Sequence, residues 1–124
     1  MAFEINSSSP PAGCEPGGRQ YRYILPPATG TDGNGNPVGA VGTPEVELHF
    51  ARLSAAGWAY YVAFVDENPG VALTSLETWN PYASNGAGAY ETYTTAIMHR
   101  PTYEETTWGG DYLGVSIRFT GLEP

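Results

Sequence analysis

Lysine is absent from this sequence, and cysteine occurs once, as Cys14, in a chain of 124 residues. A single cysteine excludes an internal disulfide and a cysteine-cluster metal site. No apolar run approaches the roughly 20 residues that span a bilayer. The start, MAFEINSSSPP, lacks the basic and apolar regions of a signal peptide. We therefore expect one small domain with neither a signal peptide nor a membrane partner.

Positive charge is also scarce, because 5 arginines face 13 acidic side chains and the net charge is −8. Nucleic acids and anionic membranes bind proteins through basic patches. We therefore expect no direct nucleic-acid binding. Only 15% of the residues are charged, which is too few for a charged disordered tail.

The sequence lacks the residue groupings that catalysis or metal binding requires. Its two histidines, His49 and His99, are far apart in the chain and belong to no metal-ligand spacing. Cys14 lies in a Pro/Gly-rich segment with nothing nearby to activate a thiol. Glu104 and Glu105 are adjacent, so on a strand their side chains would point to opposite faces. We expect no catalytic residue, no metal and no cofactor.

One loop has part of a calcium-binding pattern. Asp32, Asn34 and Asn36 have the spacing that opens an EF-hand loop. The sixth position of that loop should be glycine and is Pro37, and the twelfth should be glutamate and is Thr43. We interpret this segment as a solvated turn.

The composition divides the chain in two. Residues 1–44 hold 8 of the 16 glycines and 7 of the 11 prolines, whereas residues 45–124 hold all 3 tryptophans. Residues 7–18 read as an extended linker, because proline fixes φ and cannot donate to a strand ladder. Residues 28–44 read as a long loop. We expect an extended Pro/Gly-rich arm over 1–44 that buries little apolar surface, and a β-rich body over 45–124.

The strongest strand signal lies near the C-terminus. Leu113, Val115, Ile117 and Phe119 alternate with other residues within 112–120, which is the period of a strand. A second strand over 102–108 precedes it across a Gly-Gly-Asp connection, so the two predict a hairpin. The fold class is therefore mainly β: a small antiparallel β-sandwich or barrel-like body with an extended N-terminal arm and room for one short helix.

Other segments complete this prediction. Residues 58–65 are apolar on both faces, which favours a central strand. Residues 45–56 are ambiguous. As a strand they join 58–65 through a Ser-Ala-Ala-Gly turn, and as a helix they begin at Thr43 and Pro44. We favour the strand. The remaining strands are expected over residues 2–5, 19–25, 71–79 and 90–99.

Aromatic residues are the most unusual feature, with 9 tyrosines and 3 tryptophans. In a lectin-like module such residues would stack on sugar rings. In a structural subunit they form core and oligomer interface, because they offer large contact area at low entropic cost. We favour the second interpretation, and the candidate interface residues are Pro10, Pro11, Tyr21, Tyr23, Trp79 and Tyr82.

In its general design the chain resembles small virion structural proteins of tailed bacteriophages. The likeness lies in a retained Met1, an extended arm over 1–44 and a compact Thr- and Tyr-rich β body over 45–124. It is similar in kind to head decoration (cement) proteins. That resemblance implies a non-enzymatic virion protein, a homo-oligomer whose partners are other capsid or tail subunits and whose arm stabilises the assembly. Two alternatives stay open: a tail-tube, neck or tail-completion subunit, and a carbohydrate-binding β-sandwich module.

Overall fold

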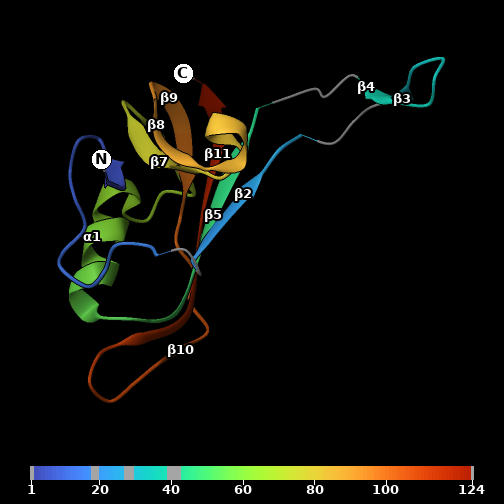
Figure 1. The fold of residues 1–124 in the computed structure, drawn as a ribbon. Coiled ribbons are helices and arrows are strands. Elements are labelled where there is room, and N and C mark those ends of the chain that lie inside the picture. The colour runs from blue at the N-terminus through green and yellow to red at the C-terminus, as the bar shows by residue number, and fades with distance from the viewer. Residues whose placement is uncertain (1, 18–19, 27–29, 39–42, 124) are drawn as a thin grey trace.

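The computed structural model describes residues 2–17, 20–26, 30–38 and 43–123. Two antiparallel sheets and one helix enclose a single core, and a short hairpin projects from them (Figure 1). The prediction of a mainly β, sandwich-like body with one helix is confirmed. No helix in these ranges is long and apolar enough to cross a membrane.

The larger sheet has the strand order β2-β5-β11-β9-β6, with β10 paired to β11. Its strands are Tyr21–Ile24 (β2), Glu45–Leu53 (β5), Gly70–Leu73 (β6), Thr95–His99 (β9), Glu105–Thr106 (β10) and Tyr112–Glu123 (β11). The alternation in β11 is real, because Val115, Ile117 and Phe119 are each at most 1% exposed. The hairpin expected before β11 is present, since β10 pairs antiparallel with β11, but its first strand covers only Glu105–Thr106 of the predicted 102–108.

The smaller sheet has the order β1-β7-β8, with strands Glu4–Ile5 (β1), Leu76–Asn80 (β7) and Ala89–Tyr93 (β8). A short 3-10 segment, Ala83–Gly86 (η1), lies between β7 and β8. The inner side chains Ile5 and Leu76 are fully buried. The register sets Glu4 opposite Glu77 on the other face of the sheet.

Two segments predicted as single strands are each divided between the sheets. The expected strand over 71–79 is β6 followed by β7, and the one over 90–99 is β8 followed by β9. At the first break the Asn6 side-chain oxygen accepts hydrogen bonds from the backbone N–H groups of Thr74 at 2.8 Å and Ser75 at 3.2 Å. These single-strand predictions are wrong because contacts distant in sequence, not local propensity, set the breaks.

The prediction of a central strand over 58–65 is wrong, because Ala55–Val65 is the helix α1. Ser54 caps its first turn by accepting a hydrogen bond from the Gly57 N–H at 3.3 Å. Gly57, Tyr61 and Val65 are buried at helical spacing. The strand interpretation of 45–56 is correct over β5, but the Ser-Ala-Ala-Gly stretch expected as a turn begins the helix.

The N-terminal segment packs on the body. Phe3, Ile5 and Cys14 are at most 4% exposed and belong to the core. The Tyr61 hydroxyl donates to the Cys14 carbonyl oxygen at 2.9 Å, and the Cys14 sulfur lies 3.2 Å from the Ser54 hydroxyl. The expectation that residues 1–44 bury little apolar surface is therefore wrong at Phe3, Ile5 and Cys14. Met1, residue 18 and Arg19 of the expected arm and strand lie outside the described residues.

A ribbon made of β2 and β5 leaves the body and leads to a small hairpin, Gly30–Thr31 (β3) and Pro37–Val38 (β4). Figure 1 shows this hairpin at upper right, well away from both sheets and from α1. We call residues 30–38 the projecting hairpin. They lie within the loop expected over 28–44, of which residues 28–29 and 39–42 lie outside the described ranges.

Candidate functional site

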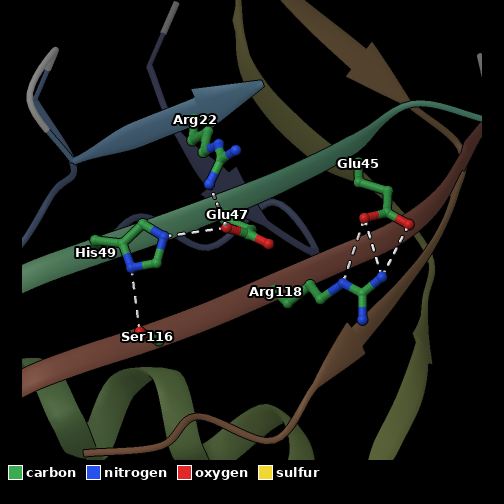
Figure 2. Close-up of polar contacts among 6 residues, drawn as sticks. All are labelled: Arg22, Glu45, Glu47, His49, Ser116 and Arg118. Atoms are coloured by element: carbon green, nitrogen blue, oxygen red, sulfur yellow. Dashed lines mark hydrogen bonds and ion pairs between the residues drawn. The ribbon is translucent and has the colours of Figure 1, made fainter. Parts of the chain in front are cut away.

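One face of the larger sheet carries a row of charged and polar side chains. On β5 the buried residues Val46, Leu48 and Phe50 alternate with outward ones, and on β11 the outward residues alternate with the buried Val115 and Ile117. We call this outward surface the open face. Figure 2 shows its central residues: Arg22, Glu45, Glu47, His49, Ser116 and Arg118.

Ion pairs across neighbouring strands organise the open face. Both oxygens of Glu45 accept from the Arg118 guanidinium, at 3.0 to 3.3 Å. Glu47 lies between two partners, the His49 Nε2 at 3.1 Å and the Arg22 Nη1 at 3.9 Å. Exposed pairs of this kind contribute about 0.2–1 kcal/mol each. They therefore orient the side chains more than they stabilise the fold.

His49 joins a hydroxyl to a carboxylate. Its Nδ1 lies 3.1 Å from the Ser116 Oγ, and its Nε2 lies 3.1 Å from the Glu47 Oε2. Hydroxyl, imidazole and carboxylate in sequence are the parts of an acyl-transfer triad. Such a site also needs N–H donors for the developing oxyanion, and the Ser116 N–H already donates to the Thr102 carbonyl at 2.9 Å.

A pocket of about 210 Å³ opens on the same face. This volume is smaller than that of most cofactor or drug-sized sites. It suits a single side chain or a small anion. The lining residues are Glu47, His49, Arg100, Thr102, Ser116, Ile117 and Arg118.

Three of the four arginines that the structure describes gather on this side of the molecule. Arg22 and Arg118 occupy outward positions of the larger sheet, and Arg100 lines the pocket. Arg52 pairs with Asp111 at 2.7 Å, at the far end of β5. Most of the positive charge among the described residues therefore lies on or beside one face. Sequence reasoning missed this face, because no short motif joins these arginines.

The aromatic members of the sequence-predicted interface set lie along the rim between β2 and β7. Tyr21 and Trp79 line one pocket of about 310 Å³ together with Pro16, Gly17 and Tyr90. The rings of Tyr23 and Tyr82 have centroids 5.9 Å apart, and Tyr82 is 59% exposed. The structure therefore brings these four aromatic residues to one rim.

Pro10 and Pro11 do not join that group. Both are half-buried in the segment that packs the N-terminus on the body. They are not among the residues that line the two pockets. Whether any of the six residues contacts a partner stays a prediction.

Buried tyrosines connect the rim to the core. The Tyr23 and Tyr93 hydroxyl oxygens are 2.8 Å apart, and the Tyr93 hydroxyl donates to Glu91 at 3.2 Å. Burial is the main cause that raises the pKa of Tyr93 well above its usual value. Burial likewise raises the pKa of Tyr21. Both hydroxyls therefore stay protonated at neutral pH, and that of Tyr93 serves as a hydrogen-bonding group.

The Asp32 loop forms a turn closed on itself. The Asp32 carboxylate accepts from the backbone N–H groups of Asn34 at 2.8 Å and Asn36 at 3.0 Å. The N–H donors of Asn36 and Asn34 lower the pKa of this carboxyl. Across the ranges that the structure describes, no group of three or more His, Cys, Asp or Glu side chains could hold a metal ion. His99, the other histidine, lies 2.8 Å from the Thr120 hydroxyl.

No family model matches this chain, and neither the curated proteins nor the solved structures include a match to it.

Proposed function

We propose that this protein is a non-enzymatic structural subunit of a viral particle, in which it holds neighbouring subunits together through the projecting hairpin. The observation that carries the proposal is the position of that hairpin, far from every part of the body that could cover it (Figure 1). An isolated two-stranded hairpin is at best marginally stable in water. A neighbouring subunit would supply the missing contacts.

Exposed aromatic side chains support an assembling role. Trp108 is fully exposed at the turn between β10 and β11, and Tyr103, which precedes β10, is 51% exposed. Tryptophan and tyrosine are enriched at protein interfaces, where they bury large areas. The β10–β11 turn, which carries Trp108, and the projecting hairpin lie at opposite ends of β5 (Figure 1). A subunit with contact surfaces at both ends can bridge two neighbours.

Within this proposal the first candidate is capsid decoration, and the second is a tail-tube or neck subunit. The separation of the two contact ends favours the second candidate, because a repeating contact between different ends generates rings or tubes. Electron microscopy of the purified protein distinguishes them. Rings or tubes formed by the protein alone would favour the tail candidate, whereas binding only to a preformed shell would favour decoration.

The direct test removes the projecting hairpin. One variant lacks residues 30–38, and a matched variant replaces them with a Gly/Ser segment of equal length. Both should fold, with a melting temperature within a few degrees of the parent, and both should lose association in light scattering or shell binding. Unchanged association in both variants would contradict the proposal.

A further inference from the structure

The two outer faces of the sandwich differ in charge. Arg22, Arg100 and Arg118 lie on or beside the open face of the larger sheet. The outer face of the smaller sheet carries Glu4 and Glu77, directly opposite each other on β1 and β7. Like charges at directly opposed positions of a sheet destabilise it. The fold therefore retains an unfavourable pair.

Only neutral groups contact this glutamate pair within the described residues. The Ser9 hydroxyl donates to Glu4 at 3.0 Å, and the Ala2 N–H donates to Glu77 at 3.3 Å. The ion pairs of the described residues involve Glu45, Glu47 and Asp111 instead. Within the described residues, these two half-buried carboxylates thus have no cationic partner.

The open face has guanidinium groups available for such carboxylates. Arg22 is 69% exposed, and its single ion pair within the described residues, with Glu47, is long at 3.9 Å. Arg118 contacts Glu45 through Nε and Nη2, and Figure 2 shows its third nitrogen pointing away from Glu45. Arginine can bind a second carboxylate without giving up the first, because it has five N–H donors.

One chain cannot bring these groups together, because the two outer faces point away from the same core. We propose that the open face of one copy docks on the outer face of the β1-β7-β8 sheet of a second copy. Arginines of the first copy then neutralise the Glu4–Glu77 pair of the second. The contact joins two different surfaces, so it repeats from copy to copy. This docking mode rests on the proposed function of a self-associating subunit, and it specifies two surfaces that come into contact.

The test uses charge reversal on each surface separately. Arg22→Glu alters the open face, Arg22→Gln removes its charge with less local repulsion, and Glu77→Arg alters the acidic face. Glu123→Arg makes the same charge change at an exposed site on β11 and serves as the control. Sedimentation at low and high salt measures association, and circular dichroism checks that each variant folds.

We expect Arg22→Glu and Glu77→Arg each to weaken self-association at least about tenfold, a loss that is larger at low salt. Arg22→Gln should weaken it less, and Glu123→Arg should leave it unchanged. A mixture of Arg22→Glu and Glu77→Arg should form dimers that do not grow, because each variant keeps the surface that the other lacks.

Two other outcomes separate the two proposals. If the parent associates and loses association without residues 30–38, but the charge variants associate normally, this docking mode is wrong and the structural role stands. If the parent remains monomeric at every concentration and salt, and binds no shell, the proposed function fails as well.

Discussion

The projecting hairpin, formed by β3 and β4, lies between β2 and β5 of the body in the chain, yet different forces stabilise the two regions. Within the body, β2 pairs with β5 from Tyr21 opposite Leu48 to Ile24 opposite Glu45, and the inner residues Val46 and Leu48 are fully buried. In the projecting hairpin the pairing covers only Gly30 with Val38 and Thr31 with Pro37. Gly30 and Thr31 are exposed. Paired strands occur in both regions, whereas buried side chains, among those described, occur in the body alone.

This difference predicts that the body determines stability and that the hairpin serves association. Burial of apolar area is the dominant stabilising contribution in folding, at about 25 cal/mol per Å². The body buries such apolar area, and this burial drives its folding. Residues 30–36 of the projecting hairpin are exposed, so we expect substitutions in the body to change stability and changes in the hairpin to affect association alone.

The largest expected effect is in the core of the body. Phe119 on β11 is fully buried and packs edge-on against Phe3, with ring centroids 6.0 Å apart. Phe119→Ala should lower the free energy of unfolding by about 3–5 kcal/mol, enough to unfold much of so small a domain. Urea unfolding measures it, with Leu25→Ala, at a site 44% exposed, as the control. A loss below about 1 kcal/mol would show that the core is centred elsewhere.

The second-largest effect is expected at high pH, and it concerns the stability of the body. Burial raises the pKa of Tyr21, Tyr61 and Tyr93, and raises that of Tyr60 to about 12. The unfolded chain loses these protons near pH 10, and the native body keeps them. The free energy of unfolding therefore falls as pH rises above about 10, because the native state then binds more protons.

Unfolding in urea at several values from about pH 8 to pH 12 checks this expectation. Stability should be nearly constant below about pH 9 and fall above about pH 10. Tyr60→Phe should make the fall less steep, because it removes one of the protons concerned. A stability that stays constant up to about pH 12 would contradict the assigned burial of these hydroxyls.

A smaller effect is expected at the start of α1. Ser54→Ala removes the side-chain acceptor for the Gly57 N–H, which should cost about 1 kcal/mol. Ser54→Asp keeps an N-cap acceptor and should retain most of the stability. Equal losses in both variants would indicate that the contact between Ser54 and Cys14 matters more than the cap.

The smallest effect is expected in the projecting hairpin. Asp32→Ala removes the acceptor for the Asn34 and Asn36 N–H groups, but these bonds lie in an exposed turn far from the core. The melting temperature of the body should stay within about 1 °C of the parent, and calcium should not change it. A saturable calcium-dependent rise that Asp32→Ala abolishes would show that the loop binds the ion.

Several elements could be predicted from the sequence because their signal is local. The alternation of Val115, Ile117 and Phe119 indicates one buried face whatever the rest of the chain does. The Gly-Gly-Asp connection before it favours a hairpin in the same way. The strand over β5 and the mainly β class follow from such patterns as well. Each of these features depends on residues within a few positions of one another.

Other elements were decided by the tertiary structure. The run over α1 is apolar on both faces, and such a short run fits a buried strand or a packed helix equally well. Packing of Tyr61 and Val65 against the core settles it as a helix. The divisions between β6 and β7 and between β8 and β9 depend on Asn6 and Glu123, which are distant in sequence.

The open face is the clearest case of a feature that only the fold creates. Arg22, Arg100 and Arg118 come from separate parts of the chain. The amino-acid composition shows only that arginine is rare. The order β2-β5-β11 places these residues on one surface and leaves Glu4 and Glu77 on another. Composition by itself determined the acidic charge and the absence of a basic motif. The distribution of that charge depends on long-range strand pairing, which no local pattern encodes.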